Sequence, residues 1–127
     1  MDEVRRKRVE SVIRELVSKL IVTGEIKDPR VSTFISIIRV EVAKDVTTAR
    51  IYVSSIESED ALLRAVKGLN NAAGFIQKNI GRVLHMRSTP RLKFYPDTSL
   101  KEGFEMSQKL DALSQEIHAH DSEQEDE

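Results

Sequence analysis

Apolar residues recur every three or four positions from Val9 to Ile21, and this spacing predicts an amphipathic helix. Gly24 follows the last apolar positions, where glycine commonly ends a helix. We therefore expect a first helix over about residues 2–22. Pro29 then disfavours helical angles at Asp28, so a rigid loop should lead into the next element.

Two segments rich in β-branched and aromatic residues follow, at 34–43 and 48–55. The short break between them predicts a β-hairpin. In the second segment Ala49, Ile51 and Val53 alternate with polar or amphipathic residues. Successive side chains of a strand point to opposite faces, so one face of the hairpin should be packed and the other exposed to water.

A long stretch with helical spacing runs from Ser58, a suitable N-cap, to Met86. As one straight helix it would be about 43 Å long. A domain of about 100 residues is only roughly 33 Å across, so the helix should bend. The sequence N-A-A-G at 71–74 is the expected place, because glycine relaxes the backbone and small side chains allow close approach. We expect two helices, over about 59–71 and 74–86.

The remaining chain predicts one strand and one helix. Residues 91–95 alternate as a third short strand, which Pro96 ends. Beyond it, helical spacing to about residue 117 is carried by Phe104, Met106, Leu110, Leu113 and Ile117. The last ten residues hold too few apolar side chains to offset the entropy of ordering. The expected fold class is α+β: one domain over 1–103 in the order α-β-β-α-kink-α-β, with a three-stranded sheet packed on helices, a helix over 104–117 and a disordered acidic tail over 118–127.

Charge is divided unevenly along the chain. Residues 1–104 carry 19 Lys and Arg against 13 Asp and Glu, whereas residues 105–127 carry one Lys against eight acids. A basic body of this kind favours a polyanionic partner, although such a surplus is also common on surfaces that bind nothing. The absence of cysteine excludes a disulfide framework and favours a reducing cytoplasm. No segment is apolar enough to predict a membrane span, so we expect a cytoplasmic protein.

Three motifs together resemble the ribosome-binding factor A family. They are K-D-P-R-V at 27–31, V-E-V-A-K-D-x-x-x-A-R-I-Y-V-S at 40–54 and L-N-N-A-A-G-F-I-Q-K-N-I-G-R-V-L-H-M-R-x-x-P-R-L-K-F at 69–94. The resemblance covers about residues 4–103 and implies a bacterial small-subunit assembly factor with a type II KH-like fold. It also implies that an interhelical kink at Ala72, Ala73 and Gly74 replaces the G-x-x-G loop of ordinary KH domains. Gln77 departs from the basic residue that the resemblance leads us to expect there.

The kink is the first candidate RNA-binding site, comprising Asn71, Ala72, Ala73, Gly74, Lys78 and Arg82. A helix that begins near Gly74 offers backbone N–H groups and a positive dipole end to a phosphate. Lys78 and Arg82 lie one turn apart on that helix. The alternative is that Gly74 only permits helix packing and that the two cations solvate a surface.

Further basic residues form a second and a third group. Arg87, Arg91 and Lys93 surround the third strand, and Arg5 and Arg8 belong to a basic run in the first helix. Each could neutralise phosphates without reading bases. The alternative is a solvated charged face. Arg30, also a candidate, could equally hold its loop to an acidic neighbour.

No motif predicts an enzyme, a cofactor or a metal centre. The sequence has no nucleophile and base at a recognisable spacing and no phosphate-binding glycine loop. His118, His120 and Asp121 could suggest a metal site, but residues two apart do not share a helix face.

The resemblance implies a non-catalytic factor that binds the 30S subunit and 16S rRNA, supports rRNA maturation and is released with help from a ribosome-associated GTPase. We expect it to be a monomer. Two other interpretations remain open: a general KH module for single-stranded RNA, and a protein–protein adaptor that uses the hairpin edge.

Overall fold

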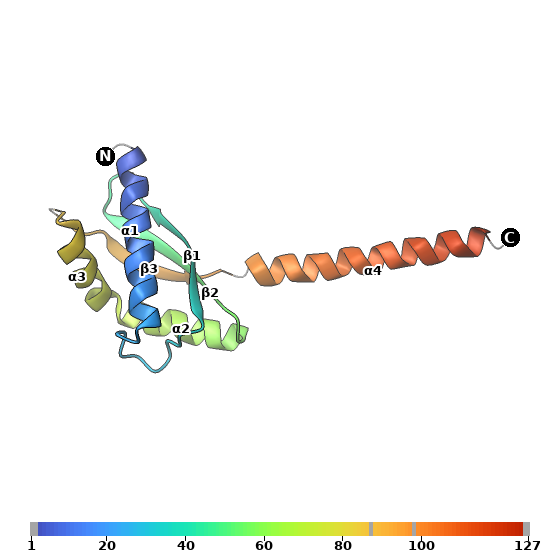
Figure 1. Ribbon diagram of the computed structural model, residues 1–127, viewed down its shortest axis with the longest axis horizontal. Helices are drawn as coiled ribbons and strands as arrows, with labels where there is room; N and C mark the ends of the chain where they lie inside the picture. Colours follow the sequence, from blue (N-terminus) through green and yellow to red (C-terminus); the bar gives the residue numbers. More distant parts are fainter. Residues whose placement is uncertain (1–2, 87, 98, 126–127) are drawn as a thin grey trace. The chain divides into compact units, whose positions relative to one another are not determined.

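The computed structural model describes residues 3–86, 88–97 and 99–125, without the side chains of 99–102 and 118–125. Figure 1 shows its elements, which are α1 (Glu3–Val22), β1 (Ile35–Val42), β2 (Thr48–Ser55), α2 (Glu59–Asn71), α3 (Ala73–Leu84), β3 (Arg91–Pro96) and α4 (Ser99–Glu125). The α+β class and the order expected from the sequence are confirmed. The chain divides into two units, Met1–Asp97 and Thr98–Glu127.

Helix α1 ends as its sequence predicts. Gly24 has a φ of +69°, a left-handed conformation that glycine adopts without steric cost. Its N–H donates to the Ile21 carbonyl at 3.2 Å, and the Glu25 N–H donates to the Leu20 carbonyl at 3.0 Å. These two bonds form a Schellman motif, which satisfies carbonyls that the end of a helix would otherwise leave open.

The sheet has the order β1-β2-β3, with β2 antiparallel to β1 and parallel to β3. A bulge lies between Ile37 and Arg39, where the pairing with β2 shifts. The bulge also changes which positions of β1 are buried, from Ile35 and Ile37 before it to Val40 and Val42 after it. One extra residue thus keeps apolar side chains of both halves of the strand on the same face.

The core lies between that face of the sheet and helices α1, α2 and α3. Figure 1 shows α1 passing across the sheet. Ile13 of α1, Leu69 of α2 and Ile76 of α3 are fully buried, as are Ile51 and Phe94 of the sheet. The alternation predicted for the hairpin is therefore confirmed. No helix of the described residues 3–97 buries the opposite face, where polar and aromatic side chains of β2 and β3 alternate with the core positions.

Both edges of the sheet receive a side chain from a helix. The Val42 N–H of β1 donates to Glu10 Oε1 of α1 at 3.0 Å. On β3, the Phe94 N–H donates to Asn70 Oδ1 at 2.9 Å, and Asn70 Nδ2 donates to the Phe94 carbonyl at 3.1 Å. Asn70 thus imitates the neighbouring strand that β3 lacks at this position, which reduces the exposed pairing capacity of the edge.

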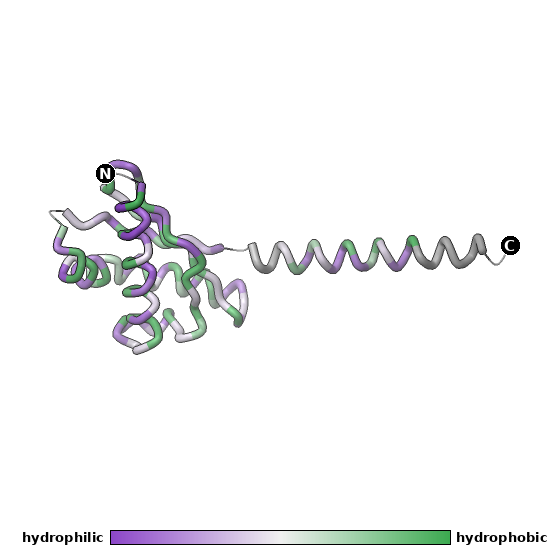
Figure 2. The backbone as a smooth tube through the Cα atoms, turned by 45° about the horizontal axis from the view of Figure 1, so that its top comes forward, coloured by the Kyte–Doolittle hydropathy of each residue, from purple (hydrophilic) through white to green (hydrophobic). Residues whose placement is uncertain are grey.

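Helix α4 differs from the expected C-terminal region. Its backbone is helical to Glu125, whereas the sequence predicted a helix to about residue 117 and a disordered tail beyond it, and residues 126–127 lie outside the described chain. This segment has no proline or glycine, and each residue added to an existing helix gains a hydrogen bond without burial. Figure 2 shows hydrophobic residues recurring along the described part of α4, where five apolar side chains are more than half exposed.

Candidate nucleic-acid interface

The break between α2 and α3 falls on one residue, Ala72, which has φ −90° and ψ 4°. Helix α2 begins with a cap in which the Ala61 N–H donates to Ser58 Oγ, and it ends at Asn71. Helix α3 begins at Ala73, one residue earlier than expected, and ends two residues earlier, at Leu84. The predicted bend is confirmed, and it joins two helices with separate axes.

Gly74 does not cause the bend, which corrects the reason given for it from the sequence. It lies in the first turn of α3 without a positive φ, and a Cβ added there would have no atom within 4 Å. Glycine disfavours a helix by about 1 kcal/mol relative to alanine, so its presence needs another explanation. No contact among the described residues explains the glycine, because Ala72 makes the bend and the space around Gly74 is open.

Two other glycines do have packing reasons. A Cβ on Gly68 of α2 would lie 2.9 Å from Val31 Cγ2, and a Cβ on Gly81 of α3 would lie 2.7 Å from Thr89 Oγ1. Both contacts are too close for a real side chain. The packing alternative raised for Gly74 therefore applies to Gly68 and Gly81. Of the three glycines in α2 and α3, Gly74 alone has open space around it, which would allow a ligand to approach its backbone.

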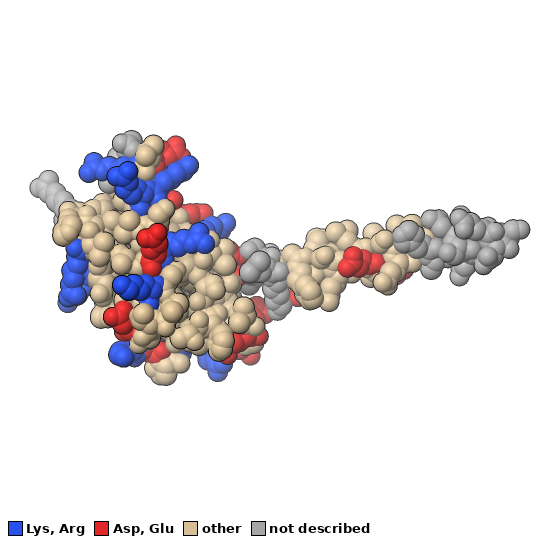
Figure 3. Space-filling view, viewed as in Figure 1, with Lys and Arg blue, Asp and Glu red and all other residues tan. Residues whose placement is uncertain are grey.

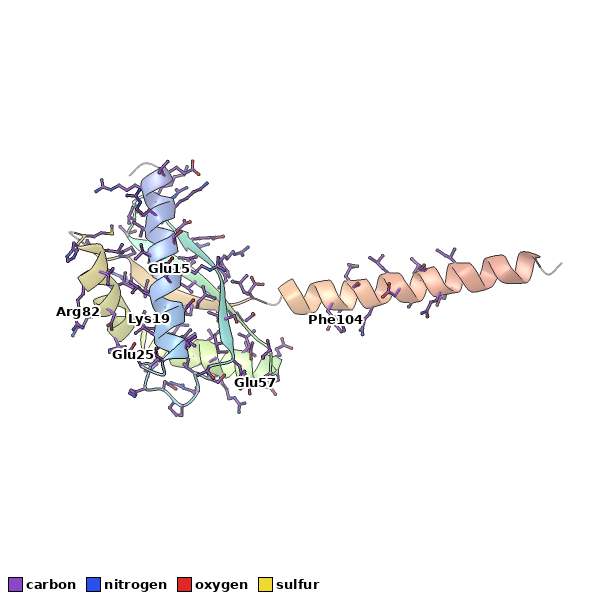
Figure 4. The ribbon with its side chains drawn as sticks, viewed as in Figure 1. Glu15, Lys19, Glu25, Glu57, Arg82 and Phe104 are labelled. Carbon is purple, nitrogen blue, oxygen red and sulfur yellow. The ribbon has the colours of Figure 1, made fainter. Side chains whose placement is uncertain are left out.

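The first turn of α3 can attract an anion. No side chain caps its N-terminus, so the positive end of the helix dipole is not met by a carboxylate or hydroxyl of the N-cap. Lys78 and Arg82 are exposed one turn apart and form no ion pair with any residue that the structure describes. Figure 3 shows cationic side chains at the edge of the unit where α3 lies. Figure 4 shows Arg82 pointing away from the body of this unit. Gly74, Lys78 and Arg82 thus lie on one helix, as expected.

A loop beside the junction is fixed by Asp28. The Arg30 N–H, Nε and Nη2 donate to its carboxylate at 3.0, 3.0 and 2.8 Å, and Asn71 Nδ2 donates to it at 3.4 Å. The hydrogen bonds from the Arg30 side chain, with smaller contributions from its backbone and from Asn71, hold the pKa of Asp28 well below its usual value. Arg30 therefore has the loop-holding role that the sequence left open, and Asn71 is tied to the same carboxylate.

The other predicted basic residues do not join the junction. Arg91 and Lys93 alternate with the buried Leu92 and Phe94, so they lie on the sheet face opposite the helices. Arg5 and Arg8 are exposed in the first turns of α1. Arg87 lies outside the described residues. The candidates therefore form separate surfaces instead of one.

Sequence reasoning missed one structural residue and one surface. Asn70 was not singled out, yet it satisfies the edge of β3. The outer face of the sheet also places Tyr52 beside Tyr95 and Arg50 beside Lys93. The alternation within each strand was visible, but the neighbours across strands depend on a register that the sequence did not provide.

Other kinds of site are absent from the described part of the chain. No described helix is long and apolar enough to cross a membrane. Among the described residues there is no group of three or more His, Cys, Asp or Glu side chains that could hold a metal ion. The side chains of His118, His120 and Asp121 lie outside this description.

Known proteins resemble this chain over most of its length. Residues 5–110 match the family described as Ribosome-binding factor A. A protein of that name from Treponema denticola is 47% identical over 113 residues, which cover 89% of this chain and 86% of that protein. One from Borreliella burgdorferi strain ZS7 is 40% identical over 111 residues, covering 87% and 92%.

Solved structures show the same fold. The crystal structure of ribosome-binding factor A from Thermus thermophilus matches with a TM-score of 0.61 and 24% identity, over 72% of this chain and 93% of that one. A homology model of the Thermus thermophilus factor, fitted into a cryo-EM map of a 30S complex, matches with a TM-score of 0.58 and 24% identity over the same shares.

Proposed function

The chain belongs to the ribosome-binding factor A family, and we propose that it binds the immature 30S ribosomal subunit through 16S rRNA. The fitted 30S complex of the Thermus thermophilus relative supports this choice of partner. In this chain the proposal rests on one observation: the α2–α3 junction carries a helix glycine that no described contact requires, at an uncapped helix N-terminus.

The junction would act on the sugar–phosphate backbone. A phosphate would lie against the first turn of α3, where the open space at Gly74 allows the two backbones to approach. Lys78 and Arg82 would neutralise the next phosphates along the same helix face. Such contacts position a protein on RNA without reading its bases. Asn71, held by Asp28, and the small side chains of Ala72 and Ala73 keep the approach to this turn open.

Membership of the family supports a proposal for the cellular role. We propose that the factor supports 16S rRNA maturation in the cytoplasm as a monomer without catalytic activity. Its release would involve a ribosome-associated GTPase. Arg5 and Arg8 would add phosphate contacts at the other end of the helical layer, and Arg30 would contribute mainly by holding the loop beside the junction.

The competing interpretations make different demands on the structure. A general module for single-stranded RNA would use the same junction, but it would bind short oligonucleotides as tightly as it binds the subunit. An adaptor that works through a sheet edge would need free edge groups. Glu10 accepts from one backbone N–H of the β1 edge, and Asn70 bonds to the N–H and the carbonyl of Phe94 on the β3 edge, so both edges offer fewer free groups to an adaptor's partner.

The proposal is tested with a double variant, Lys78→Glu with Arg82→Glu. We expect it to fold normally and to lose sedimentation with immature 30S subunits, because both side chains are exposed and make no described ion pair. Loss of two phosphate contacts should also lower the slope of log affinity against log salt by roughly two.

The matched control reverses the same amount of charge elsewhere, with Lys44→Glu in the hairpin turn and Lys109→Glu in α4. Neither lysine belongs to a candidate surface. The control should keep binding within about twofold. Equal binding by a folded Lys78→Glu, Arg82→Glu protein would refute the junction as the RNA contact.

A further inference from the structure

The outer face of the sheet carries an ordered stack of aromatic and cationic side chains. Tyr52 of β2 and Tyr95 of β3 are direct neighbours in the parallel register, with ring centroids 5.5 Å apart and planes inclined by 25°. Arg39 of β1, opposite Tyr52, places its guanidinium carbon 4.1 Å from the Tyr52 ring centroid. Lys93 Nζ lies 5.4 Å from the Tyr95 ring centroid. All three strands therefore contribute to one row of layered groups.

A hollow lies beside Tyr95 at the open edge of this row. Its volume is about 560 Å³, which falls within the range of small-molecule sites, roughly 300–1,000 Å³. Its cationic walls are Arg50, Arg91 and Lys93. None of these three forms an ion pair with any described residue. The hollow thus offers an aromatic ring and three cationic side chains without a described ion pair at one place.

The stack also has a purely structural interpretation. Cross-strand aromatic pairs and cations over rings each stabilise a sheet. That interpretation accounts for Tyr52 and Tyr95 and for the two cations over their rings, Arg39 and Lys93. It does not account for Arg91, which forms no ion pair and lies over no ring among the described residues, or for Arg50, which lies opposite Glu41 in the β1–β2 register without forming an ion pair.

We propose that this face is a second nucleic-acid site, which takes an unpaired RNA segment by stacking a base on the Tyr52–Tyr95 layer and placing its phosphates against Arg50, Arg91 and Lys93. Bases of any identity have a face that stacks on an aromatic ring or a guanidinium plane. This face carries four cations, Arg39 included, and the single acid Glu41. Such an excess of positive charge favours a polyanion as the binding partner over another protein. The site goes beyond the junction, because it lies on the sheet face opposite the helices.

The protein contains its own reporter for this site. Tyr52 and Tyr95 are the only two tyrosines of the sequence, and there is no tryptophan, so tyrosine fluorescence comes from the proposed stack alone. A base that stacks there should quench this fluorescence. The full chain is titrated with oligouridylate of about eight nucleotides, a length typical of single-strand sites. Free N-acetyl-tyrosinamide in the same titration corrects for absorption of light by the oligonucleotide.

Conservative variants separate the stack from the fold. Tyr95→Phe keeps an aromatic ring and leaves Tyr52 as the single emitter, and it should bind within about twofold of the parent. Tyr95→Leu removes the ring and should weaken oligonucleotide binding about tenfold, which lies within the range seen when a base-stacking side chain is removed. If Tyr95→Leu does not fold, Arg91→Gln with Lys93→Gln changes only exposed side chains and should give a similar loss.

The result is kept distinct from the test of the junction by repeating the titration with Lys78→Glu and Arg82→Glu. If the oligonucleotide still quenches tyrosine fluorescence in this double variant, the sheet face is a separate site. If the quenching is lost, the proposal of a separate site is overturned. Unchanged tyrosine fluorescence while a labelled oligonucleotide binds the parent protein would also overturn the proposal. The proposal would also be overturned if tyrosine fluorescence responded only to ribosomal protein without RNA, because the face would then bind a protein. Quenching by oligonucleotide without any binding of 30S subunits would refute the proposed function and leave this site standing.

Discussion

Replacing Gly74 with alanine should stabilise the protein and weaken its binding to the subunit. The added Cβ meets no atom within 4 Å, and the residue lies in the first turn of a helix without a positive φ. Alanine favours a helix over glycine by about 0.8–1.0 kcal/mol in the interior, so a gain of about 0.5–1 kcal/mol is expected near the end. For a domain of this size that gain corresponds to a rise in Tm of about 2–6 °C.

The same methyl group should interfere with RNA. If a phosphate or ribose approaches the backbone at Gly74 within van der Waals distance, the Cβ displaces it, and we expect a loss of affinity of about tenfold, or about 1.4 kcal/mol. Thermal unfolding followed by circular dichroism measures the first effect, and a sedimentation titration with immature 30S subunits measures the second. Opposite signs of the two effects are expected, because one depends on the chain alone and the other on the ligand.

Gly103→Ala in α4 is the matched control. A Cβ there also meets no atom within 4 Å, and Gly103 is exposed in a helix, so the substitution raises helix propensity without touching the junction. Its subunit binding should be unchanged. The reasoning is refuted if Gly74→Ala lowers Tm, which would mean that the bend needs glycine. It is equally refuted if the variant binds as the parent does, because the open space would then have no ligand.

Four further outcomes follow from the contacts and the charge distribution. Asn70→Ala should destabilise the fold by about 1–3 kcal/mol in urea unfolding, because two backbone groups of β3 lose their partner. Gly81→Ala should cost about 1–3 kcal/mol through its clash with Thr89, and adding Thr89→Ala in a double-mutant cycle should recover part of the loss. Because the pKa of Asp28 is lowered in the fold, its contribution to stability is present above about pH 4 and is lost as pH falls further, so the difference between the protein and Asp28→Asn in urea unfolding should shrink in acid. Removing residues 118–127 should strengthen binding to unrelated RNA at low salt, and the gain should fade as salt rises; no change at low salt would exclude an electrostatic role.

The elements with strong periodicity were predictable from the sequence, and their partners were not. The apolar spacing of α1 and the glycine after it determine a local structure, as do the length and small residues at the α2–α3 bend. By contrast, the parallel pairing of β3 with β2 joins segments about forty residues apart, and nothing local encodes it. The bulge in β1 left a trace in the adjacent Ile37 and Ile38, where two apolar residues interrupt the alternation.

The candidate site divides in the same way. Exposure of Lys78 and Arg82 followed from their place off the apolar stripe, and the structure agrees. The separation of Arg91 and Lys93 from them required the register of the sheet. The conformational reason for Gly74 is wrong, since Ala72 makes the bend. Beyond Ile117, low hydrophobicity favours disorder, but a helix can continue on propensity alone, and here the backbone does so.

The two asparagines before the bend restrain it from two directions. Asn70 holds the end of α2 to the edge of β3, and Asn71 reaches the Asp28 carboxylate in the loop before the sheet. These contacts restrain the junction before any ligand binds, so binding of RNA as proposed would lose less conformational entropy there, and a larger share of the contact energy would become affinity. A second consequence is mechanical, because Asn70 also borders the hollow beside Tyr95. A ligand that shifts β3 would move the end of α2, and occupancy of one of the two proposed RNA surfaces would then alter the affinity of the other by the same factor in both directions.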